Sequence, residues 1–255
     1  MADADRVLEG RAVLITGAGR GIGKAVAVEA ARAGAAVALG GLHLENLKQT
    51  LAEVRGAGGD GIAVEVDVAN SSAVEDFVGA AVARFGRLHG AVNNAGLSSA
   101  GAGASGHRLG EVPEEALGRL IDVNLMGTWR SMRAELSHML SAGGGSIVNM
   151  SSIAGLTGVP NAGSYASTKH AIIGLSKTAA VEYARDGIRV NAVCPGLIDT
   201  DFLPQSSRTT SGGRIPMGRY GEASEIATLT VWLLSDRASY VTGASMVADG
   251  GMLAW

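Results

Sequence analysis

A tyrosine and a lysine stand four residues apart in the segment 165–169 (YASTK). Because residues four apart lie on the same face of a helix, we expect the phenol and the ammonium to share one site. A phenol has a pKa near 10 and is a poor base at neutral pH. A cation about 5 Å away, at an effective dielectric of about 20, contributes roughly 3 kcal/mol, or about two pKa units. The spacing therefore predicts that Lys169 lowers the pKa of Tyr165 towards the range useful for proton transfer.

Two further polar side chains could complete this site. Ser152 follows a short apolar run thirteen residues before Tyr165, and Asn124 lies upstream in a helical pattern. A serine hydroxyl can hold a carbonyl oxygen while a neighbouring phenol protonates it. Taken singly, Ser152 also fits a helix or turn cap, and Asn124 also fits a satisfied polar group in a packed helix. Together with Tyr165 and Lys169, however, they predict an acid-base site.

A second chemical signal is the glycine-rich segment 16–23 (TGAGRGIG), which follows an apolar run and opens a helical pattern. Glycine lets backbone N–H groups approach a phosphate closely, and a helix N-terminus favours the negative charge. The segment therefore predicts a cradle for a pyrophosphate. Its spacing differs from the common dinucleotide pattern G-x-G-x-x-G, and a purely structural turn would use the same glycines.

The order of these motifs along the chain resembles the short-chain dehydrogenase/reductase family, in particular its 3-oxoacyl-(acyl-carrier-protein) reductase-like members. The resemblance covers nearly the whole chain. The matching residues are Thr16, Gly17, Gly21 and Gly23 in the glycine motif T-G-x-x-x-G-x-G, Asn93, Asn94, Ala95 and Gly96 in an N-N-A-G motif, Asn124, Ser152, Tyr165 and Lys169 as a tetrad, and Pro195, Gly196 and Thr200 in a segment over the nicotinamide.

This resemblance implies an NAD(P)-dependent oxidoreductase that interconverts a secondary alcohol and a ketone by hydride transfer. It implies that Tyr165 donates and accepts the proton and that Ser152 holds the substrate oxygen, with Ala154 also at the substrate. It implies that Lys169 binds the nicotinamide ribose and that Asn124 anchors a water linking Lys169 to solvent. The residues expected to contact the dinucleotide are Gly17, Gly19, Arg20, Gly21, Ile22, Gly23, Gly41, Leu42, Asp67, Val68, Asn94, Ala95, Gly96, Tyr165, Lys169, Pro195, Gly196, Ile198 and Thr200.

The choice between NAD and NADP depends on the end of the second strand, where an acid about 20 residues beyond the glycine turn would bind the ribose 2′-hydroxyl. The chain has Gly41 and Leu42 there, so no carboxylate repels a 2′-phosphate. Arg20 resembles the basic residue that NADP-preferring members carry in the glycine turn, and a guanidinium suits phosphate. We therefore expect NADP(H) to be favoured over NAD(H). Leu42 departs from the pattern, since an arginine is often found there, and Arg20 could equally be a solvated loop charge.

Short apolar runs alternate with longer amphipathic segments, a pattern typical of strand-helix units in a parallel sheet. We expect one Rossmann-type α/β domain over residues 1–255, a doubly wound, seven-stranded parallel sheet with helices on both faces. Substrate loops are expected at about 97–112 and 197–217. The expected strands are 12–16, 35–40, 61–67, 90–93, 146–151, 188–194 and 245–248, and the expected helices are 22–33, 44–57, 71–85, 113–141, 163–186 and 224–234.

The composition predicts a folded protein, because 47% of the residues are hydrophobic and only 18% are charged. A net charge of -3 gives no basic field for nucleic acid or an anionic membrane surface, so neither is an expected partner. The chain starts without a secretory signal and has no run of 18 apolar residues, so we expect a cytoplasmic protein. The resemblance implies a small carbonyl or alcohol substrate. The family resemblance implies a homotetramer.

The five histidines lack metal-ligand spacing and Cys194 is the single cysteine, so we expect no metal and no intrachain disulfide.

Two other functions stay open at this point. A dinucleotide-binding sensor that performs no turnover would share the fold, and its sign would be a damaged tetrad, whereas this tetrad is intact. An epimerase or dehydratase that uses nicotinamide transiently would share both the fold and the tetrad. It would release product without net oxidation of the cofactor.

Overall fold

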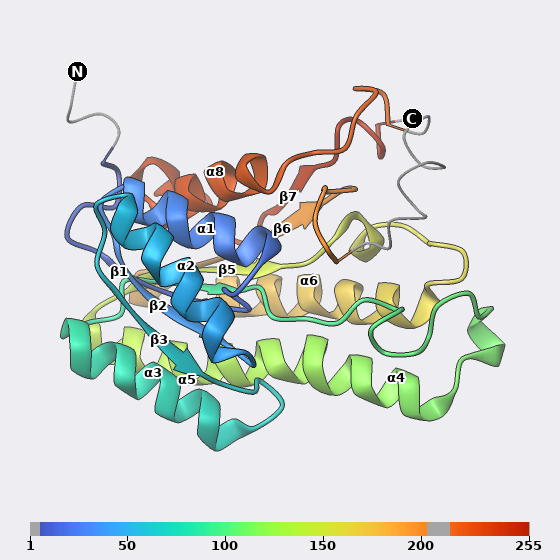
Figure 1. Ribbon diagram of the computed structural model, residues 1–255, viewed down its shortest axis with the longest axis horizontal. Coiled ribbons are helices and arrows are strands. Elements are labelled where there is room, and N and C mark those ends of the chain that lie inside the picture. The colour runs from blue at the N-terminus through green and yellow to red at the C-terminus, as the bar shows by residue number, and fades with distance from the viewer. Residues whose placement is uncertain (1–5, 203–214, 255) are drawn as a thin grey trace.

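The computed structural model describes residues 6–202 and 215–254 of the 255-residue chain. Seven parallel strands form one sheet in the order β3-β2-β1-β4-β5-β6-β7 (Figure 1). The sequence order runs outward from β1 to β3 and then returns to β4 on the other side of β1, which is the doubly wound arrangement predicted. The strands are β1 (Ala12–Thr16), β2 (Ala36–Gly41), β3 (Gly61–Glu65), β4 (Gly90–Asn93), β5 (Gly145–Met150), β6 (Ile188–Pro195) and β7 (Ser245–Ala248).

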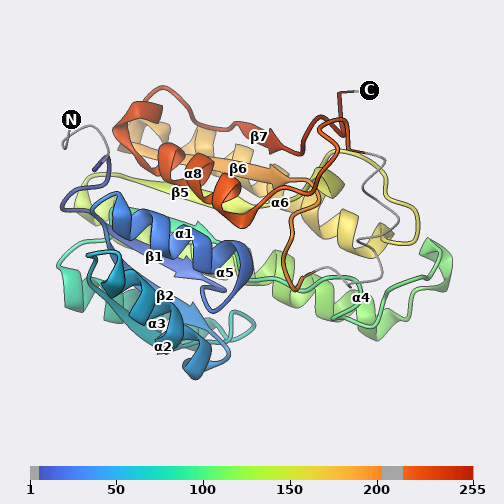
Figure 2. The same cartoon turned by 45° about the horizontal axis from the view of Figure 1, so that its top comes forward.

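Helices cover both faces of the sheet (Figures 1 and 2). One face carries α1 (Gly21–Arg32), α2 (Leu44–Gly56) and α8 (Ala223–Leu234), and the other carries α3 (Ser71–Phe85), α5 (Gly127–Ala142) and α6 (Gly163–Tyr183). The shorter α4 (Glu114–Leu120) extends beyond the sheet and continues through a π-helical turn (Ile121–Met126) into α5. Short 3₁₀ turns lie at Leu109–Glu111, Ile153–Gly155, Ala184–Asp186 and Asp236–Ala238.

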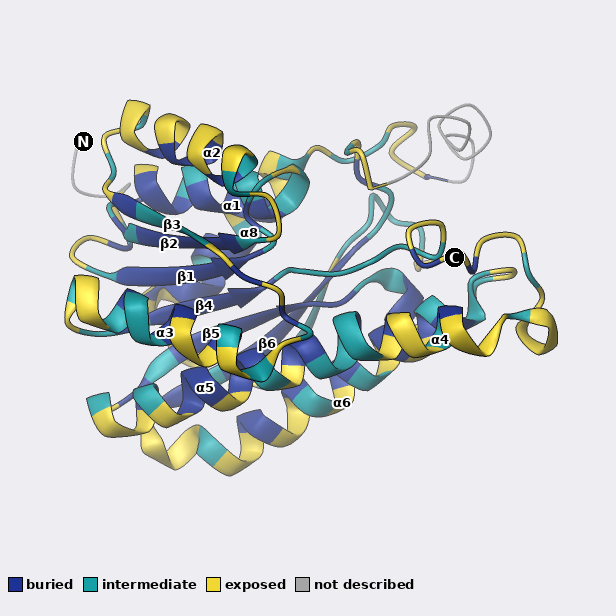
Figure 3. Ribbon diagram, turned by 60° about the horizontal axis from the view of Figure 1, so that its bottom comes forward, coloured by how far each residue is buried: buried dark blue, intermediate teal, exposed yellow. Residues whose placement is uncertain are grey.

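The central strand explains why the sheet needs a helical layer on each side. All five residues of β1 are buried, which is typical of a parallel sheet covered on both faces (Figure 3). Successive side chains point to opposite faces, so Val13 and Ile15 belong to the core under α1 and α8. Leu14 belongs to the other core, together with Phe77 of α3 and Ile147 of β5. None of the helices in the described ranges is long and apolar enough to span a bilayer.

Three expected elements differ from the structure by more than one residue at an end or are divided. The third strand ends at Glu65 instead of Asp67, because the Asp67 carboxylate turns back to accept a hydrogen bond from Ala69 N at 2.9 Å. The single helix expected over 113–141 is divided by the π-helical turn. The helix expected to reach residue 186 ends at Tyr183 and continues as a 3₁₀ turn. The expected loop at 97–112 is irregular apart from a 3₁₀ turn, and residues 203–214 of the expected loop at 197–217 lie outside the described part of the chain.

Candidate active site

The carboxyl ends of the central strands meet at one edge of the sheet, where ligands bind in doubly wound folds. The glycine turn follows β1 and the segment 94–96 follows β4. Ser152 follows β5, and Gly196 follows β6. The topology therefore brings the separate sequence motifs to one edge of the sheet.

The glycine turn is shaped by close backbone contacts. Gly17 has a φ of 65°, which favours glycine, and a Cβ there would lie 2.9 Å from Ala95 Cα. A Cβ on Gly23 would lie only 2.2 Å from Gly17 O, so no larger residue fits. Helix α1 begins at Gly21, and its N-cap residue Arg20 makes no side-chain hydrogen bond to the helix. An open turn that leads into an uncapped helix N-terminus fits a pyrophosphate.

Thr16, the last residue of β1, joins the glycine turn to the segment after β4. Its Oγ1 accepts hydrogen bonds from Asn94 N and Ala95 N, both at 3.1 Å. The Asn94 side chain in turn donates from Nδ2 to Gly17 O at 3.1 Å. Asn94 thus fixes the glycine turn, and its predicted contact with the dinucleotide stays a prediction. The sequence identifies Thr16 only as a member of the glycine motif, because a buried hydroxyl between two strands gives no periodic signal that would predict these hydrogen bonds.

The start of α6 brings Tyr165 and Lys169 together, as their spacing predicts. Lys169 Nζ lies 5.5 Å from the centre of the Tyr165 ring and donates to Met150 O at 2.8 Å. The Tyr165 side chain hydrogen-bonds to the Ser152 side chain, and Ser152 Oγ also accepts from Ala154 N at 3.1 Å. A hydroxyl, a phenol and an ammonium therefore line one site. Ala154 is buried within the turn after Ser152.

The predicted lowering of the Tyr165 pKa is wrong for this structure. Burial raises the pKa of Tyr165 to about 12, and the hydrogen bond from Ser152 opposes this only in part. Burial also lowers the pKa of Lys169 to about 8. The physical reason is that removing the phenolate from water costs more than the nearby polar groups return. At neutral pH Tyr165 therefore carries its proton, which suits a proton donor.

Asn124 lies in the π-helical turn and is fully buried. Its Oδ1 accepts from Leu97 N at 2.7 Å, and its Nδ2 donates to Leu97 O at 3.0 Å. The same Nδ2 lies 3.3 Å from Thr168 Oγ1 on α6. The side chain therefore ties the loop after β4 to the helix that carries Tyr165. The water-anchoring role that the family resemblance implies for Asn124 stays a prediction.

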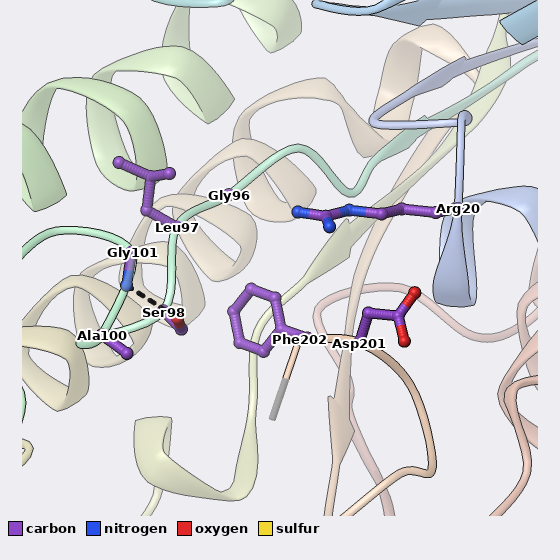
Figure 4. A pocket seen from close by; sticks show the side chains of 8 residues that line it. All are labelled: Arg20, Gly96, Leu97, Ser98, Ala100, Gly101, Asp201 and Phe202. Atoms are coloured by element: carbon purple, nitrogen blue, oxygen red, sulfur yellow. Dashed lines mark hydrogen bonds between the residues drawn. The ribbon is translucent and has the colours of Figure 1, made fainter. Parts of the chain in front are cut away.

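A cleft of about 260 Å³ opens beside these groups (Figure 4). Arg20 reaches into it from the glycine turn towards Gly96, and the Phe202 ring stands opposite the loop after β4. Its lining residues are Arg20, Gly96, Leu97, Ser98, Ala100, Gly101, Asp201 and Phe202. The Phe202 ring centre lies 6.2 Å from that of Tyr165, so the cleft adjoins the Tyr165 ring. Phe202 lies in the expected loop at 197–217. The residues around it show no helical or strand periodicity, so the sequence does not predict its contact with Tyr165.

The other residues predicted to contact the dinucleotide lie at several points along this edge. Thr200 packs over the glycine turn, with its Cβ 3.5 Å from where a Cβ on Gly21 would stand. Gly41 and the exposed Leu42 are at the end of β2, next to the turn, where Ala18 N donates to Gly40 O at 3.0 Å. Val68 is buried against Gly127, whereas Asp67 is exposed. Pro195 ends β6, and Ile198 is buried beside the bridge to Gly221.

Comparison with known proteins supports this picture. Residues 17–253 match the family model described as enoyl-(acyl carrier protein) reductase. The chain is 41% identical over 246 residues to cyclohexanol dehydrogenase of Acinetobacter sp. (strain SE19), covering 94% of each chain. It is 39% identical to a 3-oxoacyl-(acyl-carrier-protein) reductase of Thermotoga maritima, covering 96% of this chain and 99% of the relative.

Solved structures agree with the sequence comparisons. The crystal structure of levodione reductase superimposes with a TM-score of 0.92 at 35% identity, covering 97% of this chain and 99% of that one. A short-chain type dehydrogenase/reductase from Mycobacterium marinum gives a TM-score of 0.92 at 33% identity, covering 98% and 99%. The chain therefore belongs to the short-chain dehydrogenase/reductase family of NAD(P)-dependent oxidoreductases, as its motifs predict.

Proposed function

We propose that this protein interconverts a cyclic secondary alcohol and the corresponding ketone, with NADP(H) as the preferred cofactor and Tyr165 as the proton donor and acceptor. The observation that carries the proposal is the meeting of Tyr165, Ser152 and Lys169 beside a glycine turn and an open cleft. The dinucleotide supplies and accepts the hydride when it is bound. The residues of the chain then have to hold the substrate oxygen and move one proton.

In the direction of reduction, Ser152 Oγ–H and Tyr165 Oη–H donate to the carbonyl oxygen, and Tyr165 passes its proton to that oxygen as the negative charge develops. The raised pKa of Tyr165 keeps the phenol protonated before the transfer. The Lys169 ammonium, 5.5 Å from the ring, stabilises the phenolate that the transfer leaves behind. In the direction of oxidation the same groups act in reverse, and Tyr165 accepts the alcohol proton.

A cyclic substrate is supported by the cleft and by the relatives. The Leu97 and Ala100 side chains and the Phe202 ring give the cleft apolar walls next to Tyr165. Apolar walls beside Tyr165 favour an uncharged part of the substrate over a charged or strongly hydrated group. Two relatives are named for ring alcohols, cyclohexanol dehydrogenase at 41% identity and 2,5-dichloro-2,5-cyclohexadiene-1,4-diol dehydrogenase of Sphingobium indicum at 39%.

A panel assay tests this function. The protein is mixed with NADPH or NADH, and the loss of reduced-nicotinamide absorbance is followed with cyclohexanone-type ketones, linear 3-oxoacyl thioesters and an enoyl thioester. We expect turnover to be fastest with the cyclic ketones and NADPH. Faster turnover of either thioester would contradict the substrate class. Substrate conversion without any change in absorbance would favour an epimerase or dehydratase, and the absence of all conversion would favour a sensor.

The NADP preference rests on the end of β2, where Gly41 and Leu42 bring no carboxylate. We expect Gly41→Asp to raise the Kd for NADPH at least about tenfold while leaving that for NADH the same or lower, because a carboxylate there repels a 2′-phosphate. A Cβ on Gly41 would make only an ordinary 3.5 Å contact with Leu47 Cδ2, so the substitution fits. Gly41→Asn is the control of matched size. Equal loss for both cofactors, measured by fluorescence titration, would contradict the assignment.

Three further properties belong to the same proposal. We propose a homotetramer in the cytoplasm that acts on a small molecule. Exposed apolar side chains on α5, α6 and β7 are consistent with contacts between copies, namely Trp129, Val181 and Val247.

A further inference from the structure

A cluster of buried polar side chains lies between the sheet and the helices α5 and α6, and the proposed chemistry does not use it. At its centre is Glu135 of α5, which is 0% exposed. Asn93 of β4 and Asn149 of β5 lie beside it, and Ser176 of α6 completes the cluster. Figure 3 shows α5 and α6 side by side under the sheet, with their buried sides towards the strands.

The hydrogen bonds of the cluster run from one element to the next. Asn93 Nδ2 donates to Glu135 Oε2 at 3.0 Å and to Asn149 Oδ1 at 2.9 Å. Asn149 Nδ2 donates to Ser176 Oγ at 2.9 Å, and Ser176 Oγ donates to Ile172 O at 2.7 Å. Both amide hydrogens of Asn93 are therefore used, one towards the acid and one towards the neighbouring amide.

Two oxygens of the same pair lack a partner among the described residues. Glu135 Oε1 and Asn93 Oδ1 are both buried, and within residues 6–202 and 215–254 neither accepts a hydrogen bond. If Glu135 were ionised, both atoms would be acceptors only, and a buried carboxylate would be held by one amide hydrogen. Leaving two acceptors and a charge unsatisfied in the interior destabilises the folded state. A proton on Oε1 would turn that oxygen into a donor, and Asn93 Oδ1 is the unpartnered acceptor on the same amide that already donates to Glu135 Oε2.

We propose that Glu135 is a neutral carboxylic acid whose Oε1–H donates to Asn93 Oδ1 while Asn93 Nδ2 donates to Glu135 Oε2, a cyclic acid-amide pair that positions the elements carrying the active site. The pair joins α5 directly to β4, and Asn149 and Ser176 extend it to β5 and α6. Glu135 is thus a positioning residue that acts through Asn93. The acid-amide pair can be tested without knowing which substrate the protein converts.

The places of these residues explain why the pair affects the site. Asn93 immediately precedes the segment that packs on the glycine turn. Asn149 stands three residues before Ser152 on β5, and Ser176 stands seven residues after Lys169, two turns along the same face of α6. Loosening the pair would therefore change the relative positions of the elements that hold Ser152 and Lys169.

In the part of the chain that the structure describes, the elements packed around Glu135 bring no compensating charge to it. Burial raises its pKa to about 8 from 4.5, and the hydrogen bond from Asn93 opposes the rise. On the facing helix α3, Glu75 pairs with Arg133 of α5 at the surface. On α6, Lys169 Nζ is directed to Met150 O, and Lys177 is exposed. The groups of β4 and β5 that face Glu135 are the neutral amides of Asn93 and Asn149.

This arrangement predicts how stability changes with pH. The folded state keeps the Glu135 proton up to about pH 8, whereas the unfolded chain loses it near 4.5. Between these values the unfolded state binds fewer protons, so stability falls as pH rises and then levels off above the folded-state pKa. Glu135→Gln cannot ionise, yet its Nε2–H can still donate to Asn93 Oδ1. The Gln variant should therefore keep the pair and lose the pH dependence.

Urea unfolding of the full-length protein from pH 5 to 9 tests the pair. We expect the unfolding constant of the native protein, divided by that of Glu135→Gln, to rise about tenfold for each pH unit up to about pH 8 and then to level off. Glu75→Gln, a surface carboxylate on α3, should keep the slope of the native protein. Glu135→Met removes both hydrogen bonds, and its unfolding constant should exceed that of the Gln variant about tenfold or more at pH 5.

An infrared difference spectrum provides a readout that does not depend on unfolding. At pH 6 the native protein minus Glu135→Gln should show the C=O stretch of a buried protonated carboxylic acid, and this band should disappear above about pH 8. Should Glu135→Gln fail to fold, the same band is sought in the native protein by difference between pH 6 and pH 9. Absence of the band at pH 6, or identical pH slopes in the native and Gln proteins, would overturn the proposal.

Discussion

Replacing Tyr165 by Phe is expected to lower kcat for ketone reduction by about three orders of magnitude, because positioned general acids contribute about 10²–10⁴-fold. The substitution removes only the hydroxyl that bonds to Ser152 and would protonate the substrate oxygen. The ring keeps its place beside Lys169 and Phe202, so the fold and the affinity for the dinucleotide should change little. Initial rates with saturating NADPH and the best ketone of the panel measure the effect.

A matched control for this variant is Tyr183→Phe, which removes a hydroxyl at the other end of the same helix. Its kcat should stay within about twofold of the native value. Native turnover by Tyr165→Phe would refute the assigned role. If its kcat falls while NADPH titration shows the native Kd, the loss is specific to the chemical step.

Replacing Ser152 by Ala is expected to lower kcat by about 10²–10³-fold, the usual effect of removing one donor that stabilises a developing oxyanion. The Ser152 hydroxyl is bonded to Tyr165 and accepts from Ala154 N, so its loss affects both the phenol and the adjoining turn. The KM for the ketone should change less than kcat, because the bond strengthens as charge develops on the oxygen. Steady-state rates over a range of ketone concentrations separate the two constants.

The neighbouring Ser151 gives the comparison for this prediction. Its Oγ donates to Lys169 O at 2.9 Å inside the core, so this hydroxyl supports the backbone of α6. We expect Ser151→Ala to lose about 1 kcal/mol of stability and less than tenfold in kcat. A larger kcat loss in Ser151→Ala than in Ser152→Ala would reverse the assignment of the substrate-binding hydroxyl.

Much of the fold could be predicted because its signals are local. β1 is four apolar residues followed by Thr16, and the glycine turn follows it directly, so both the strand and the start of α1 are evident in sequence. The four-residue spacing of Tyr165 and Lys169 likewise needs only helical periodicity. These features require no knowledge of distant contacts.

What could not be predicted depends on tertiary structure. The π-helical turn at Asn124 shifts backbone hydrogen bonds without changing the apolar pattern, so the sequence predicts a continuous helix. The direction of the Tyr165 pKa shift depends on burial, which outweighs the hydrogen bond with Ser152. The contact between Glu135 and Asn93 joins residues 42 positions apart. The helical pattern around Glu135 and the strand pattern around Asn93 predict the two elements, but they do not predict that these two side chains meet.

The most direct test of the central claim follows the hydride itself. The protein is incubated with a cyclic ketone and NADPH carrying deuterium at the reactive C4 position, and the alcohol product is analysed by mass spectrometry and NMR. We expect one deuterium at the carbinol carbon for each cofactor oxidised when the label is on the transferred face. Alcohol formed without deuterium from either labelled face, or converted substrate with all the cofactor still reduced, would contradict direct hydride transfer by this protein.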